Sequence, residues 1–285
     1  MISDITLGQF FPGNSPIHKL DPRTKIILAT IYIVSVFVVN NPVGFLLLAL
    51  SALFIVAISK ISFRVVLKSI KPIVYILLFT ALLNIFMTEG ENLLVSFWVI
   101  RIYVEGVVRA VMMALRVIVL IIGTSALLTY TTSPISLTDG LEALLAPLKK
   151  INVPVHTFAM MMSIALRFIP TLIEETEKIM NAQKSRGADF TSGSLAQRAK
   201  ALIPILVPLF VSSFKRAEEL ATAMECRCYR GDNNRTKLVK LEYRRSDFSA
   251  IVFMMLFMCA MILLSTIPYT FGSLGPVLGL VFYRV

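Results

Sequence analysis

The sequence predicts an all-α protein: a polytopic membrane helical bundle with about five spans, to which long cytoplasmic amphipathic helices are attached. Composition is the first observation, because 56% of the 285 residues are apolar, 16% are charged and the mean hydropathy is +0.79. Soluble domains carry about 25% charged residues, so a soluble enzyme is not expected. The second observation is that the apolar residues form runs close to the roughly 17–25 residues that cross a bilayer. Third, the Lys and Arg residues gather in a few segments, as they do in cytoplasmic loops.

The N-terminal membrane region, residues 1–139, contains four apolar runs that we interpret as spans. Asn40, Asn41 and Pro42 interrupt the first pair, which predicts a tight membrane hairpin. No secretory signal precedes the first run, so we expect that run to stay as a span. The four predicted spans lie near residues 26–40, 43–59, 72–88 and 106–130.

Charge in the connecting segments predicts the orientation. Residues 60–71 contain four basic residues and no acidic one, so this segment is expected in the cytoplasm together with the N-terminus. The loop after the third span is acidic and is expected outside. Within that loop, residues 93–104 are too few to span as a helix, and their β-branched and aromatic residues predict an extended or interfacial segment.

Two arginines, Arg109 and Arg116, lie within the fourth predicted span. An Arg at the centre of a membrane helix costs about 2.5–3.5 kcal/mol, so Arg116 is expected to face other helices or a polar cavity. We interpret both as intramembrane residues with a structural role. The alternative is that they line a transport path.

The composition changes in residues 140–245, which hold 17 Lys or Arg and 10 Asp or Glu. We predict that this region is cytoplasmic. Its apolar stretch Ala201–Val211 contains two prolines and is too short to cross, so we expect it to pack beneath or into the bundle. Residues 246–285 comprise a last span, near 248–267, and a Gly- and Pro-containing tail that is expected to be an extracellular cap or a partial re-entrant segment.

The cytoplasmic region contains a repeated helix. An offset of 41 residues brings Glu177 onto Glu218 and Arg186 onto Arg227, so two amphipathic helices of the same design end in the same residue. Each Arg either complements the negative end of its own helix or is presented to an acidic groove of a partner. Because two such helices occur, we favour the second possibility, in which each Arg is presented to an acidic groove of a partner.

Signatures of catalysis are missing from the sequence. It has no GxxxxGK[ST] loop for nucleotide phosphates and no HExxH or GxSxG motif. Cys226 and Cys228 resemble half of a metal site, but no further Cys or His is near them in sequence, and we expect reduced thiols and no bound metal.

Five motifs together are similar to a known family. They are Ser15–Lys25 (SPIHKLDPRTK), Glu105-Gly106, Arg167–Pro170 (RFIP), Ala182–Gly187 (AQKSRG) and Ala223–Gly231 (AMECRCYRG). Over essentially its whole length the chain resembles the transmembrane T component of energy-coupling factor transporters, which are ATP-driven importers of vitamins and metals.

The resemblance implies a division of labour. Arg186 and Arg227 would end two coupling helices, each docking in a groove of one of two ATP-binding cassette ATPases, which would bind ATP and Mg. A separate small membrane subunit, possibly one of an interchangeable set, would capture the vitamin or other micronutrient. This chain would bind no cofactor, catalyse nothing and lie in the cell membrane, with its N-terminus and coupling helices cytoplasmic.

The chain departs from the common family pattern at three positions beside the two arginines. Ser185 and Cys226 stand where Ala is usual in the family, and Cys228 stands where Gly is usual. Because Cys enters left-handed conformations less freely than Gly, we expect the second helix to end differently.

Two other classes of function compete with this reading. A self-sufficient secondary transporter would use Arg109 and Arg116 along its path, and a membrane-embedded enzyme lacks a nucleophile or metal set. Nucleic acid is not an expected partner, because no compact basic domain can be cut out of the sequence.

Overall fold

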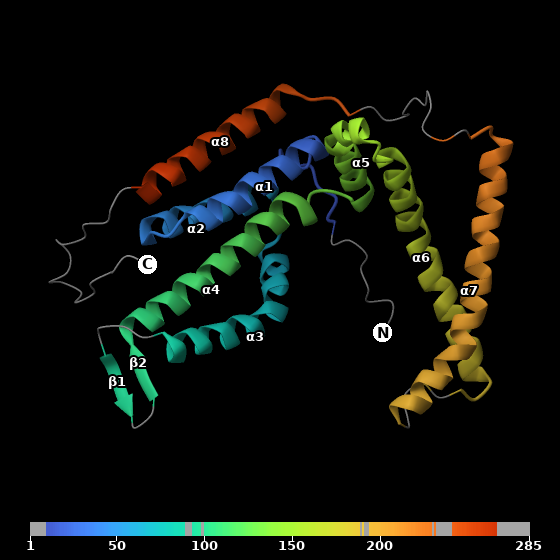
Figure 1. Ribbon diagram of the computed structural model, residues 1–285, viewed down its shortest axis with the longest axis horizontal. Coiled ribbons are helices and arrows are strands. Elements are labelled where there is room, and N and C mark those ends of the chain that lie inside the picture. Colours follow the sequence, from blue (N-terminus) through green and yellow to red (C-terminus); the bar gives the residue numbers. More distant parts are fainter. Residues whose placement is uncertain are drawn as a thin grey trace. The chain divides into compact units, whose positions relative to one another are not determined.

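The computed structural model describes residues 10–88, 93–97, 100–188, 190, 194–229, 231 and 241–266. These residues are mainly helical, which confirms the all-α prediction, and they form two compact units. Among the described residues, the first unit comprises those within 10–133 and 241–266, and the second comprises those within 134–231. Figure 1 shows the elements of each unit.

Five long helices and one hairpin make up the described part of the first unit. Proline begins both of the first two helices, where its missing N–H costs nothing. The helices are α1 (Pro22–Val38), α2 (Pro42–Ser59), α3 (Phe63–Met87), α4 (Val104–Thr124) with its π-helical continuation η1 (Ser125–Thr129), and α8 (Arg245–Thr266). The strands are β1 (Leu93–Phe97) and β2 (Ile100–Tyr103).

The core of the first unit lies where α1 packs against α4 and α8. Tyr32 of α1 is fully buried and its hydroxyl donates to the Val119 carbonyl at 3.3 Å. Gly123 makes this contact possible, because a Cβ at that position would overlap the Tyr32 ring. The aromatic ring therefore sets the close approach of the two helices.

The third helix begins earlier than the sequence predicts. We placed the span near 72–88 after a basic cytoplasmic segment, but α3 begins at Phe63 and includes Lys68 and Lys71 in its first turns. Pro72 does not end the helix, because only one backbone hydrogen bond is lost. Figure 1 shows that α3 is bent, as expected for a helix with an internal proline.

The predicted extended segment after α3 is confirmed. β1 and β2 form an antiparallel pair in which Ser96 lies opposite Arg101 and Phe97 opposite Ile100. The expected cap or re-entrant tail, residues 268–285, lies outside the described residues.

A buried polar cluster, defined by Ser15, Asp21, Lys25 and Asp247, joins the N-terminal motif to two other parts of the first unit. The Asp247 carboxylate accepts from the backbone N–H of Asp21 at 2.8 Å and from that of Arg244 at 2.7 Å. The Lys25 ammonium donates to the Thr131 carbonyl at 2.8 Å. We call this group the polar clamp; it holds the starts of α1 and α8 to the end of η1.

The second unit consists of α5 (Pro134–Leu145), the 3₁₀ turn η2 (Ala146–Ile151), α6 (Val155–Ser185) and α7 (Leu195–Cys226). Ser194 and Gln197 form a capping box at the start of α7. The apolar stretch Ala201–Val211 is part of α7, which continues through Pro204 and Pro208 for 32 residues; its packing beneath or into the bundle stays a prediction.

By length and composition, four described helices can cross a membrane: 63–87, 106–129, 155–185 and 245–266, with 43–59 as a shorter apolar helix. Three of the four long helices overlap predicted spans. The fourth is α6, which lies within residues 140–245, the region predicted to be cytoplasmic from its many charged residues. The cytoplasmic placement of residues 140–245 stays a prediction.

Candidate functional site

The two matched helices end in the same backbone geometry. In α6 the Gly187 N–H donates to the Lys184 carbonyl at 2.9 Å, and the Ala188 N–H donates to Gln183 at 3.0 Å. In α7 the equivalent bonds run from Cys228 to Glu225 at 2.8 Å and from Tyr229 to Met224 at 3.0 Å. Both are Schellman motifs, and the 41-residue repeat therefore extends to individual hydrogen bonds.

The prediction that Cys228 changes the end of the second helix is wrong. Cys228 adopts a left-handed conformation with φ 56°, which corresponds to φ 87° at Gly187. The two hydrogen bonds of the Schellman motif hold the strained residue in place. A left-handed residue that is not glycine costs about 1–2 kcal/mol, so Cys228 makes the second helix end less stable than the first.

Each arginine occupies the residue that caps its helix, and each is exposed. Arg186 has φ −88° and ψ 7°, and Arg227 has φ −90° and ψ 17°. In the described part of the chain, neither guanidinium group has a hydrogen-bond or ion-pair partner. The terminal carbonyls are already satisfied by backbone N–H groups. Both charges are thus available to another molecule.

The small residues beside the arginines are exposed as well. Ser185 and Gly187 flank Arg186, and Cys226 and Cys228 flank Arg227. Both cysteines are free thiols. Among the described residues, no group of three or more metal-ligating side chains is found.

Helices α6 and α7 pack antiparallel around an ion pair that sequence analysis missed. Arg216 of α7 pairs with Glu175 of α6, and the Ser212 hydroxyl donates to the same carboxylate at 3.1 Å. The only signal in the sequence was that Glu175 and Arg216 are opposite in charge and are related by the 41-residue offset.

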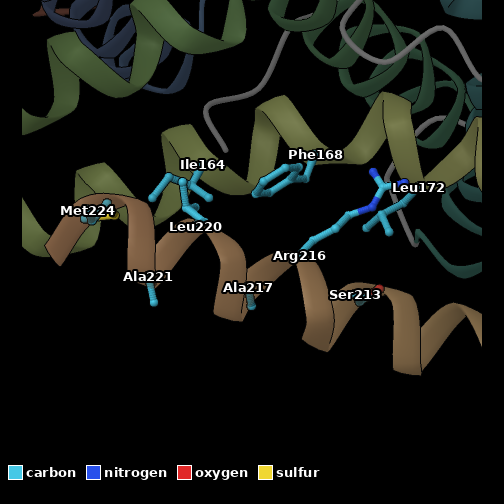
Figure 2. Close-up of a pocket in the computed structure, with 9 residues that line it drawn as sticks. All are labelled: Ile164, Phe168, Leu172, Ser213, Arg216, Ala217, Leu220, Ala221 and Met224. Carbon is cyan, nitrogen blue, oxygen red and sulfur yellow. The ribbon is translucent and has the colours of Figure 1, made fainter. Parts of the chain in front are cut away.

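An apolar pocket of about 280 Å³ lies along the same contact. Figure 2 shows Leu220 and Arg216 of α7 extending toward Ile164, Phe168 and Leu172 of α6, with the residue numbers rising along one helix and falling along the other. Residues of the amphipathic repeat therefore line the place where the two helices meet.

Part of the apolar stripe of the amphipathic helix α7, at Leu206, Phe210 and Phe214, is exposed. Phe210 and Phe214 are 65% and 63% exposed, and their rings pack on each other at 4.6 Å. Leu206 is exposed in the same stripe. A stripe of this kind on a folded protein indicates a contact with lipid or another protein.

The intramembrane arginines have different surroundings. The Arg116 guanidinium donates to the Val39 carbonyl at 2.8 Å and to the Asn40 side chain at 2.9 Å, and it lies over the Phe45 ring. These contacts satisfy the end of α1 and hold the α1–α2 connection against α4. Arg109 is exposed on α4.

The comparisons with known proteins agree with these features. Residues 13–238 match the family described as cobalt transport protein (CbiQ). The chain is 55% identical over 264 residues to the energy-coupling factor transporter transmembrane protein EcfT of Clostridium kluyveri, covering 92% of this chain and 97% of the relative. It is 53% identical to the protein of that name from Ruminiclostridium cellulolyticum, covering 93% and 98%, and 49% identical to that of Bacillus subtilis, covering 88% and 95%.

The fold, the paired helix ends and these relatives define a membrane protein of a transport system. The chain belongs to the family of transmembrane T components of energy-coupling factor transporters.

Proposed function

We propose that this T component couples two ATP-binding cassette ATPases to a small substrate-binding membrane subunit, and that Arg186 and Arg227 are its anchors on the ATPases. The observation that carries the proposal is the pair of equivalent Schellman ends, each presenting an exposed guanidinium group without a partner in the described residues. Arginine suits this task, since its charge is permanent and its fork binds a carboxylate through two hydrogen bonds.

The exposed apolar stripe of α7 supports a contact with the second partner, the small substrate-binding membrane subunit. Phe210, Phe214 and Leu206 would face the small membrane subunit, whose surface is itself apolar. An interface that accepts interchangeable subunits would be mainly apolar, because fixed charges discriminate between partners. The vitamin or other micronutrient would then be selected by that subunit.

In this proposal the chain makes and breaks no bonds. ATP and Mg would be bound by the ATPases, since the sequence offers no phosphate-cradling loop. The protein would lie in the cell membrane with its N-terminus and coupling helices in the cytoplasm, in keeping with the distribution of basic residues.

The proposal is tested with Arg186→Glu, Arg227→Glu and the double variant, in cells that co-produce the ATPases and the small membrane subunit. Loss of one partner of a buried charge pair costs about 2–5 kcal/mol, so each reversal should weaken co-purification of the ATPases and reduce uptake. The double variant should lose both co-purification of the ATPases and uptake. Lys178→Glu and Glu219→Lys, which change exposed charges at equivalent positions of the two helices, are the matched controls.

Normal uptake by a folded double variant would refute the anchoring role and assign both arginines to their own helices. A secondary transporter is disfavoured by the contacts of Arg116, which is engaged by the end of α1. Ion-driven uptake by the purified chain alone in liposomes would support that alternative.

A further inference from the structure

The contact between α6 and α7 involves equivalent residues of the repeat. Glu175 and Arg216 are 41 residues apart, the same offset that relates Arg186 to Arg227. When two copies of a helix cross antiparallel at equivalent residues, a two-fold axis through the crossing exchanges them. The Glu175–Arg216 ion pair therefore lies on a pseudo-two-fold axis that relates α6 to α7.

Such a symmetry requires that the two helices run antiparallel, and α6 and α7 do. Figure 1 shows α6 and α7 crossing, and Figure 2 shows residues ascending along one helix beside residues descending along the other. From the crossing to its capping arginine, each helix runs eleven residues, or about 16 Å at 1.5 Å per residue. Because the helices are antiparallel, the two arms point in opposite directions.

Two charged residues that meet at such a position must be opposite in sign to attract each other. Two identical residues meet at a true two-fold axis, and two glutamates there would repel each other. In this chain one copy has Glu175 and the other Arg216, so the pair attracts. Their side chains are 27% and 32% exposed, and the Ser212 hydroxyl gives the carboxylate a further donor.

We propose that Glu175 and Arg216 are positioning residues that form the pivot of a pseudo-two-fold lever, which holds Arg186 and Arg227 on opposite sides at equal arm lengths. The partner that fits this arrangement is a pair of similar ATPase subunits related by a two-fold axis. The proposal deepens, and rests on, the assignment of the two arginines as ATPase anchors. The new inference is that the Glu175–Arg216 pair fixes which residues of α6 and α7 meet, and so fixes the length of each arm.

The pivot is tested by charge reversal in the assembled transporter. Glu175→Arg and Arg216→Glu each place like charges at the crossing, whereas the double variant restores attraction with the charges exchanged. Glu174→Lys with Lys215→Glu provides the matched control, because these residues are also equivalent and opposite in charge but are exposed. Glu175→Gln keeps the shape and an acceptor for Ser212, and so separates loss of charge from loss of folding.

The first readout is the distance between spin labels at Lys184→Cys and Glu225→Cys, which are equivalent exposed positions near the two helix ends. The native cysteines are replaced in this background. Nine residues separate each label from the crossing, which gives about 27 Å between the backbones for collinear arms. We expect one narrow distance for the parent and the exchanged pair, and a shifted or broader distribution for each single reversal.

The second readout is uptake per ATP hydrolysed, measured with the vitamin that the co-purified small subunit binds. Each single reversal should lower this ratio about fivefold while the ATPases still co-purify, and the exchanged pair should restore it. An unchanged label distance in both single reversals, or no recovery in the exchanged pair, would overturn the pivot. If the pivot results hold but Arg186→Glu and Arg227→Glu keep their ATPases, then the anchoring proposal fails and the pivot stands.

Discussion

Removal of the Asp247 side chain should destabilise the first unit more than any exposed charge does. Asp247 has no exposed surface, and its carboxylate accepts from the backbone N–H groups of Asp21 and Arg244. In Asp247→Ala both donors lose their partner. The buried Asp21 N–H left without an acceptor costs about 1–3 kcal/mol, whereas Arg244 is exposed and its N–H can bond to water. The carboxylates of Asp247 and Asp21 also attract the buried Lys25 ammonium. In Asp247→Ala that ammonium would retain only the Asp21 carboxylate.

The expected total for Asp247→Ala is about 3–5 kcal/mol, the range for breaking a buried charge contact by removing one partner. For a chain of this size that corresponds to a fall of about 10 °C in the unfolding midpoint. Asp247→Asn keeps one acceptor oxygen but turns an N–H₂ group toward the other donor, so its cost should be about half.

The assay is thermal unfolding of the purified protein in detergent, followed by far-ultraviolet circular dichroism and by the fraction that stays monodisperse. Glu219→Ala is the control, because it removes an exposed carboxylate from a helix and should change the free energy of unfolding by less than about 0.5 kcal/mol. Equal midpoints for Asp247→Ala and Glu219→Ala would refute the role of the polar clamp.

Three further predictions follow from single positions. Gly123→Ala should cost about 1–3 kcal/mol, because the new methyl group overlaps the buried Tyr32 ring; unfolding midpoints measure this, and a midpoint like that of the parent would contradict the packing. Cys228→Gly should stabilise the end of α7 by up to about 1 kcal/mol and leave uptake intact, which amide hydrogen exchange over the last turn can measure; faster exchange would disprove the strain. In a background without native cysteines, Asn92→Cys should react with an impermeant thiol reagent in intact cells, and reaction only after lysis would reverse the predicted topology.

Local patterns in the sequence account for much of the fold. Apolar runs predict the membrane helices because lipid leaves backbone groups no partner outside the helix. The end of α1 and the start of α2 follow from Asn40, Asn41 and Pro42, whose chemistry acts within a few residues. The predicted start of α3, at Pro72, is too late, since a long helix tolerates the loss of one internal hydrogen bond when its remaining bonds and packing persist. The same tolerance keeps Pro204 and Pro208 inside α7.

The candidate site, too, is only partly predictable from local sequence patterns. The 41-residue repeat gave the two arginines, because a helix end is encoded by consecutive residues. The sequence did not give the left-handed Cys228, which depends on hydrogen bonds stronger than the preference of the residue itself.

The sequence by itself determined that this is an α-helical membrane protein with two helices ending in arginine, because both properties depend on composition and on spacing along one segment. Only the tertiary structure decided that Asp247 closes the polar clamp on Asp21, and that Glu175 meets Arg216 where α6 crosses α7. Those contacts join residues 226 and 41 positions apart. Their partners are selected by how helices pack in space, and no local pattern specifies that choice.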